Sequence, residues 1–265
     1  MEPVVVTFLG SAVRVLADDP AIAETLRRNY RHLSEGPHVG RAVELELRAS
    51  DDTYACLEDG APIASRLDPS SAIRWARQRI LEHFIAARGD LLWLHGAAAT
   101  LDGKALLIPG PRGRGKSTLV TALCADGWRF LGDDTVPLDP RTLELHPFPR
   151  APEVREAPSV AMPERWLLDA QKVEHEVADR IERAPRPLGG ILLPFASRGA
   201  EASVTPCTPG EALAVIAQGC WNVADHEATI GATMSRLVTA VPVGRVAFDD
   251  GPSAAAPVRA WMLTR

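Results

Sequence analysis

Apolar positions divide the first 70 residues into strand-like runs around one helical segment. The runs 4–9, 43–49 and 54–67 are rich in aliphatic and β-branched residues, which favours strands. Between them, residues 21–33 have apolar positions at helical spacing. We therefore predict a small α+β module over residues 1–70.

From residue 70 to residue 88 the apolar positions repeat at helical intervals. They are Ile73, Ala76, Ile80, Phe84 and Ala87, with charged residues between them. This pattern predicts one amphipathic helix that ends at Gly89. We assign residues 71–265 to a second, larger domain that begins with this helix.

Residues 91–110 predict a β-hairpin. Two apolar runs flank Asp102-Gly103, a dipeptide that favours a tight turn because both residues tolerate positive φ. The strand that ends near residue 109 should therefore pair antiparallel with the strand before it. This arrangement differs from a doubly wound nucleotide-binding sheet, in which the neighbours of that strand are parallel to it.

The rest of the chain alternates predicted helices and strands. A helix over 116–127 precedes a short strand over 128–134; a strand is expected at 188–194, helices at 208–220 and 225–240, and a closing strand at 241–248. Five prolines between residues 146 and 166 exclude a central strand or an unbroken helix, so we predict a long surface loop there. The predicted fold class is α/β.

Composition and charge exclude several function classes. The chain has 29 Lys+Arg against 34 Asp+Glu and a net charge of -5, so no global basic field favours a nucleic acid or an anionic membrane as partner. No apolar stretch reaches the roughly 20 residues that span a bilayer, and the N-terminus lacks the basic start of a signal peptide. The four cysteines form no C-x-x-C pair, so a reducing cytoplasm is the expected location.

The segment 106–120, LLIPGPRGRGKSTLV, fits the phosphate-loop pattern G-x-x-x-x-G-K-[ST]. In such a loop, glycines turn backbone N–H groups toward phosphate oxygens, and the positive end of the following helix faces the same anion. Lys116 would reach the terminal phosphates and the Ser117 hydroxyl would ligate Mg²⁺. The predicted nucleotide-binding residues are Gly110, Pro111, Arg112, Gly113, Arg114, Gly115, Lys116, Ser117 and Thr118. The alternative is a glycine-rich turn that contains Lys-Ser by chance.

Asp133 and Asp134 follow the loop after one helix and one short strand. A right-handed crossover would bring the end of that strand beside the loop. One acid could then hold Mg²⁺, and the other could accept a proton from an incoming hydroxyl. The alternative is a polar turn, which is a common use of Gly-Asp-Asp sequences.

His95 and several arginines are further candidates. His95 ends an apolar run, where a hydrogen-bonded core residue is as natural an interpretation as a catalytic one. Arg112 and Arg114 lie within the loop, at positions whose side chains usually point away from the anion. Arginine suits phosphoryl oxygens, so the candidate phosphate clamps are Arg150, Arg155 and Arg186.

The order of these motifs resembles the catalytic core of the HPr kinase/phosphorylase family. That family also has a His-Gly before the phosphate-loop strand, a loop of this type, a helix that ends in Gly, and paired acids soon after. The similarity covers about residues 91–139. It implies a mixed sheet like that of phosphoenolpyruvate carboxykinase, which would explain the antiparallel hairpin. The chain is more similar to the stand-alone HPr-kinase-related group, which includes kinases of lasso-peptide precursors.

The resemblance also implies roles for single residues. Residues 110–117 would bind ATP, Ser117 and Asp133 would hold Mg²⁺, and Asp134 would act as base on the acceptor hydroxyl, with His95 and Lys116 in the catalytic site. The expected function is an ATP- and Mg²⁺-dependent kinase that acts on a seryl hydroxyl of a peptide or protein. The resemblance also allows a homo-oligomer. Two alternatives stay open: a kinase of a small hydroxylated metabolite, and a regulatory module that binds nucleotide with little catalysis.

Overall fold

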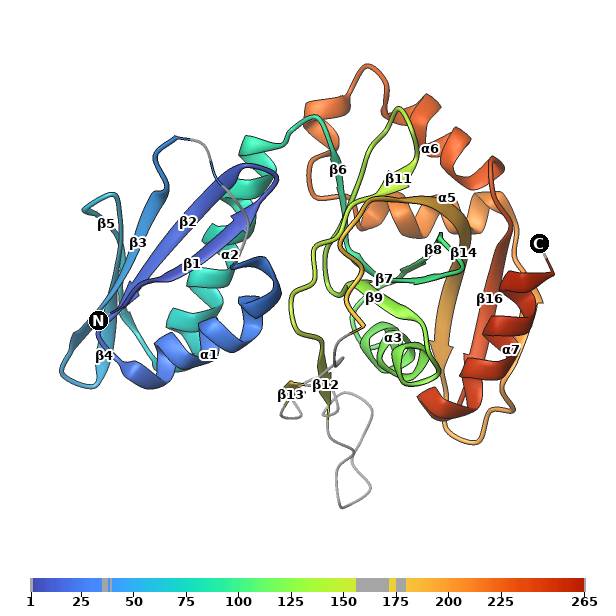
Figure 1. Ribbon diagram of the computed structural model, residues 1–265, viewed down its shortest axis with the longest axis horizontal. Coiled ribbons are helices and arrows are strands. Elements are labelled where there is room, and N and C mark those ends of the chain that lie inside the picture. The colour runs from blue at the N-terminus through green and yellow to red at the C-terminus, as the bar shows by residue number, and fades with distance from the viewer. Residues whose placement is uncertain (1, 35–37, 39, 156–171, 175–179, 265) are drawn as a thin grey trace. The chain divides into compact units, whose positions relative to one another are not determined.

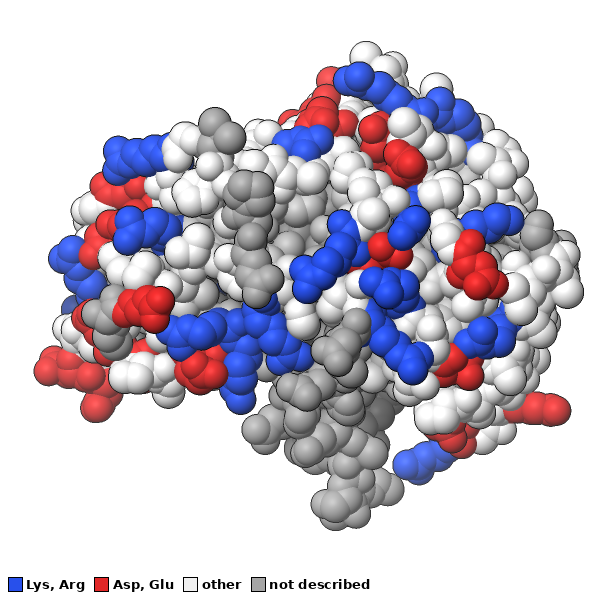
Figure 2. All heavy atoms as spheres, in the orientation of Figure 1, with Lys and Arg blue, Asp and Glu red and all other residues white. Residues whose placement is uncertain are grey.

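The computed structural model describes residues 2–34, 38, 40–155, 172–174 and 180–264. Its internal contacts divide the chain into two compact units, residues 1–89 and 90–265. Figure 1 shows a sheet and helices in each unit. Among the described helices, none combines the length and the apolar character needed to cross a membrane. On the face seen in Figure 2, residues of both charge signs are interspersed, without one large basic or acidic field.

The first unit is one five-stranded sheet with two helices. The strands, in spatial order, are β1 (Val4–Phe8), β2 (Ser11–Ala17), β3 (Val43–Ser50), β4 (Thr53–Glu58) and β5 (Ala61–Leu67). Only the β2–β3 pair is parallel, because α1 (Pro20–Tyr30) and the short helix η1 (Arg31–Leu33) lie between these two strands in the sequence. The predicted α+β module is present, with β2 as a strand that the apolar pattern did not reveal.

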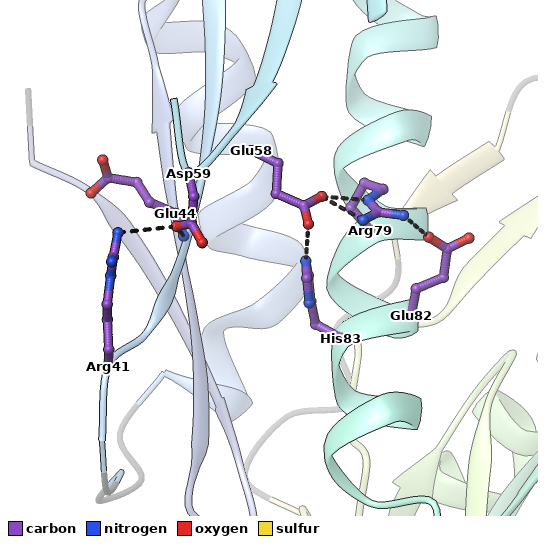
Figure 3. A network of polar contacts seen from close by, with 7 residues as sticks. All are labelled: Arg41, Glu44, Glu58, Asp59, Arg79, Glu82 and His83. Carbon is purple, nitrogen blue, oxygen red and sulfur yellow. Dashed lines mark hydrogen bonds and ion pairs between the residues drawn. The ribbon is translucent and has the colours of Figure 1, made fainter. Parts of the chain in front are cut away.

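The helix α2 (Pro69–Ala87) belongs to this first unit. Its Phe84 ring packs edge-on against Phe8, at 5.8 Å between centroids. Figure 3 shows its Arg79 and His83 directed at Glu58 of β4, with Arg79 Nε 2.8 Å and His83 Nε2 3.3 Å from the carboxylate. The predicted boundary after residue 70 is therefore corrected to Gly89, because the buried face of α2 covers the first sheet.

The second unit contains a large mixed sheet. Its main order is β6 (Leu92–Leu94), β10 (Val136–Leu138), β11 (Glu144–Leu145), β14 (Arg186–Ala196), β8 (Lys104–Pro109), β7 (Gly96–Leu101), β9 (Arg129–Gly132). In addition, β16 (Val243–Phe248) pairs parallel with β14 and antiparallel with β15 (Ser203–Pro206). A separate antiparallel pair is formed by β12 (Glu153–Arg155) and β13 (Lys172–Glu174). The predicted α/β class with a mixed sheet is thus observed.

Helices cover both faces of this sheet. The helices are α3 (Lys116–Ala125), α5 (Pro209–Gln218), η2 (Val223–His226), α6 (Ile230–Thr239) and α7 (Gly251–Leu263). The alternation of strand side chains separates two cores: Leu106 and Ile108 of β8 pack with residues of α3 and α7, whereas Leu107 packs with residues of α5 and α6. Because the side chains on both faces of β8 are buried, a ligand could contact this strand only at its carboxyl end.

The predicted hairpin is confirmed, with one difference. β7 and β8 pair antiparallel around Asp102 and Gly103, whose φ angles are 49° and 80°. The apolar run before the turn is not one strand, because the chain changes direction at His95 and β6 pairs with β10 instead. His95 therefore lies in the bend between β6 and β7 rather than within a strand, and its side chain is partly buried.

Candidate functional site

The candidate phosphate loop, residues 110–115, joins the carboxyl end of β8 to the first residue of α3. Strand, loop and helix therefore follow in the order that the sequence predicted. Lys116 begins α3 and is buried, with its Nζ donating a hydrogen bond of 3.1 Å to the carbonyl oxygen of Pro111. The ammonium group thus lies across the loop, where it would meet an anion held by the backbone N–H groups.

Gly115 is a position at which the loop requires glycine. Its φ is 91°, and a Cβ atom there would lie 2.8 Å from Cζ of Phe248 and 2.9 Å from Cβ of Ala196. Both the backbone conformation and the close packing therefore exclude a side chain. The loop is held tightly against the ends of β14 and β16, which carry these two neighbours.

The sheet topology brings the paired acids to the loop. β9 pairs antiparallel with β7, and β7 pairs antiparallel with β8, so β8 and β9 run in the same direction. Their carboxyl ends consequently meet at one edge of the sheet. Asp133 directly follows β9, just as Gly110 directly follows β8.

Asp133 is the buried acid of the pair. Its exposed fraction is 2%, its carboxylate accepts a hydrogen bond from the Ser117 side chain, and its Oδ1 has no hydrogen-bond partner among the described residues. Burial, together with the charge of Asp134, raises the pKa of Asp133, against the opposing effects of Ser117, Arg150 and Lys116. A buried carboxylate oxygen without a partner is costly unless a proton or a cation satisfies it.

These donors fit a magnesium ion in part. Mg²⁺ prefers oxygen ligands and in nucleotide sites takes one or two protein oxygens, with phosphates and waters supplying the rest. The Ser117 hydroxyl and the Asp133 carboxylate are such oxygens, already in contact with each other. In the part of the chain that the structure describes, no group of three or more His, Cys, Asp or Glu could hold a metal on its own. A magnesium site here would therefore depend on a bound phosphate chain.

Asp134 is half-exposed and contacts two other predicted residues. Its Oδ2 accepts a hydrogen bond of 3.0 Å from the Arg150 guanidinium, and its main-chain oxygen lies 2.9 Å from Nδ1 of His95. The backbone φ of Asp134 is 71°, a left-handed conformation that Asp tolerates better than most residues. The turn after β9 thus separates the two acids, with Asp133 buried and Asp134 turned to the surface.

His95 is partly buried between Asp134 and Trp221. Burial and the charge of Lys116 lower the pKa of His95 below its ordinary value of 6.5, although Asp134 acts in the opposite direction. The neutral imidazole is therefore favoured at pH 7, with Nδ1–H placed to donate to the Asp134 carbonyl. The other ring contact is edge-to-face with Trp221, at 5.8 Å between centroids.

The remaining predicted residues lie at varied places. Arg112 and Arg114 are exposed, and the Arg114 guanidinium lies 5.5 Å from the centre of the Phe195 ring. Thr118 lies in the first turn of α3, close to the start of α7. Arg186 forms an ion pair of 3.0 Å with the buried Glu182, so its guanidinium is engaged in a structural ion pair. The side chain of Arg155 lies outside the described residues.

Two exposed aromatic residues at the site were not predicted from the sequence. Trp221 and Phe195 have exposed fractions of 48% and 42%. Trp221 is fixed by its backbone N–H, which donates to the Trp93 carbonyl at 2.8 Å, and by the buried Asn222 beside it. The available signal was weak: Phe195 is a large aromatic residue in the last residues of β14, and Trp221 follows shortly after the end of α5.

Comparisons with known proteins give little further information. No family model and no curated protein matches the chain. Among solved structures, the Hpr(Ser) kinase/phosphatase from Coxiella burnetii is similar over 65% of this chain and 97% of its own, with 13% identity and a TM-score of 0.32. The phosphoryl transfer proposed below therefore rests on the residues of the site.

Proposed function

We propose that the chain is an ATP- and Mg²⁺-dependent kinase that transfers the γ-phosphoryl group to a seryl-type hydroxyl of a peptide or protein. The observation that carries this proposal is the contact between the two predicted motifs. The buried Asp133 is hydrogen-bonded to Ser117 of the loop, and its Oδ1 has no partner among the described residues. A glycine-rich turn that merely joined a strand to a helix would have no need of this buried acid.

The loop supplies the phosphate-binding part of the proposed mechanism. Backbone N–H groups of residues 110–115 and the Lys116 ammonium would hold the β- and γ-phosphates. Ser117 and Asp133 would hold Mg²⁺, which, when bound, neutralises the charge that develops on the transferring phosphoryl group. The lowered exposure of Lys116 and Asp133 strengthens these interactions, because water screens them less.

Asp134 supplies the proton-accepting part. In the proposed step the acceptor oxygen forms a bond to the γ-phosphorus while the bond from that phosphorus to the ADP oxygen breaks, and the acceptor proton passes to the Asp134 carboxylate. His95 and Arg150 fix the position of Asp134. The γ-phosphate would offer Arg150 a second anionic partner, which would release Asp134 to accept the proton.

The acceptor class comes from the resemblance to the HPr-kinase-related group, and the site geometry leaves room for it. Asp134 is turned to the surface, with 42% of its side chain exposed, so a hydroxyl carried by a polypeptide could reach it.

Intact-mass analysis tests this function. Candidate peptides and carrier proteins encoded beside the gene are incubated with Mg²⁺-ATP and the wild type, Asp134→Asn or Asp102→Asn. Asp102 is an exposed hairpin residue with a φ of 49°, where Asn is well tolerated, so it is a matched control.

We expect a phosphoryl adduct on one acceptor with the wild type and with Asp102→Asn, and none with Asp134→Asn. Fragmentation of the adduct would locate the modified hydroxyl. If no polypeptide is modified, the same incubation is repeated with small hydroxylated metabolites, and an adduct there would replace the peptide acceptor. Nucleotide binding without any adduct would favour the regulatory module.

A further inference from the structure

Phe195 stands out as an exposed aromatic residue at the end of a buried strand. It lies near the carboxyl end of β14, whose Ile191 and Leu192 are fully buried, yet 42% of Phe195 is exposed. An aromatic ring at the surface loses the free energy that burial would supply. Its place beside a candidate phosphate loop suggests a ligand that covers it.

The ring is physically tied to the loop. The Arg114 guanidinium lies 5.5 Å from the ring centre, and the next residue, Ala196, donates its backbone N–H to the Arg114 carbonyl at 3.3 Å. Ala196 also packs so closely on Gly115 that no side chain fits there. The position of Phe195 relative to the phosphate-binding backbone is therefore fixed by the two contacts of its neighbour Ala196, with Arg114 and with Gly115.

The sheet order separates Phe195 from the acids. β14 adjoins β8 on one side, whereas β9, which leads to Asp133 and Asp134, lies beyond β7 on the other side. Figure 1 shows β14 in the sheet between β8 and β16. In the proposed kinase the acids mark the γ-phosphate end, so a nucleoside that leaves the loop on the opposite side would approach Phe195.

We propose that Phe195 and Arg114 form the platform on which the base of the bound nucleotide stacks. This inference rests on the proposed function, because it assigns the base of the same nucleotide. Aromatic faces and planar guanidinium groups both stack on nucleobases, and stacking responds to ring area rather than to the hydrogen-bonding edge. The platform therefore favours purines over pyrimidines and distinguishes little between adenine and guanine.

The test compares a ligand that carries a base with one that does not. Binding of ADP and of inorganic pyrophosphate, each with Mg²⁺, is measured by calorimetry on the full chain. The variants are Phe195→Ala, Phe195→Tyr and Arg114→Ala. Leu263→Ala is the matched control, because Leu263 is another exposed large apolar residue of the same unit, 59% exposed at the end of α7.

We expect Phe195→Ala to weaken ADP binding about tenfold or more and to leave pyrophosphate binding unchanged. Phe195→Tyr and Leu263→Ala should keep the wild-type affinity for ADP, and Arg114→Ala should weaken ADP more than pyrophosphate. An equal change in the affinities for both ligands, or no change, would overturn the platform. Wild type that binds pyrophosphate as tightly as ADP would overturn it too while leaving the proposed function intact, and wild type that binds neither would overturn both.

Discussion

The imidazole Nδ1 of His95 lies 2.9 Å from the main-chain oxygen of Asp134 and 3.5 Å from its carboxylate Oδ1. His95 occupies the bend between β6 and β7, and Asp134 follows β9, so this contact joins two points far apart in the sequence. A histidine that could have been an ordinary core residue thus fixes the acid to which we assign the proton transfer.

Replacement of His95 by Gln should reduce the pH dependence of stability. Burial lowers the pKa of folded His95 below 6.5, so between that lowered value and 6.5 the unfolded chain binds more protons than the folded chain. The free energy of unfolding therefore falls as pH is lowered through this range, and part of this fall disappears in His95→Gln. Urea unfolding at pH 7.5 and pH 5.5 measures it; His38→Gln, at an exposed histidine, is the control. If the free energy of unfolding changed by the same amount between these two pH values in the wild type and in His95→Gln, His95 would not be the source of the pH dependence.

Replacement of Arg150 by Ala should move the acid limit of nucleotide binding to higher pH. Burial and Asp134 raise the pKa of Asp133, and the Arg150 cation is one of the groups that hold it down. Without that cation the pKa of Asp133 rises further, so the ionised form that would hold Mg²⁺ is lost at a higher pH.

Calorimetry of Mg²⁺-ADP binding across pH measures this effect. We expect Mg²⁺-ADP to bind Arg150→Ala more weakly than the wild type at the acid end of the pH range, because less Asp133 is ionised there. Arg259→Ala, which breaks only a partly exposed pair with Asp126, is the control. An unchanged acid limit in Arg150→Ala would show that Arg150 does not act on Asp133.

Local signals in the sequence were sufficient for much of the second unit. The turn residues Asp102 and Gly103 predicted the hairpin, and the helix predicted over 208–220 is present as α5, capped by Thr208 in a capping box with Glu211. The phosphate loop could be placed because its pattern requires a strand before it and a helix after it. These features depend on residues within a few positions of each other.

Features that depend on distant residues could not be predicted in the same way. The assignment of α2 to the first unit depends on contacts with Phe8 and Glu58, which no local pattern contains. The helix α7 was missed because small alanines give a weak periodic pattern and Pro257 interrupts it. The roles of Phe195 and Trp221 depend on exposure, which is decided only when the sheet is assembled. Of the proline-rich loop, residues 156–166 lie outside the described residues.

Substitution of Gly115 by Ala should destabilise the chain and abolish phosphate binding. Its φ of 91° costs a side chain about 1–2 kcal/mol, and the crowding against Phe248 and Ala196 adds about 1–3 kcal/mol. Gly103→Ala is the matched control, because its φ is 80° but no atom lies within 4 Å of the added Cβ. Urea unfolding should show the larger loss for Gly115→Ala; equal losses would mean that the packing of the loop on β14 and β16 contributes nothing.

Substitution of Asn222 by Ala should release Trp221 from its place beside His95. Asn222 is 5% exposed, its Oδ1 accepts from the Trp93 N–H at 3.0 Å, and its Nδ2 donates to the Leu91 carbonyl at 2.9 Å. Its loss removes both of these buried hydrogen bonds, while the Leu91 carbonyl keeps its contact with Nε2 of His226 at 3.1 Å, so the expected cost is about 1–3 kcal/mol. We expect a lower free energy of unfolding and increased quenching of tryptophan fluorescence by acrylamide.

Asn29→Ala is the contrasting control. Asn29 is also buried, but neither polar atom of its side chain has a hydrogen-bond partner among the described residues, so its removal breaks no such bond. If Asn222→Ala and Asn29→Ala lost equal stability, volume rather than hydrogen bonding would explain both. A larger loss for Asn222→Ala, together with weaker phosphoryl transfer and unchanged Mg²⁺-ADP affinity, would place Trp221 on the acceptor side of the proposed site, opposite the Phe195 platform.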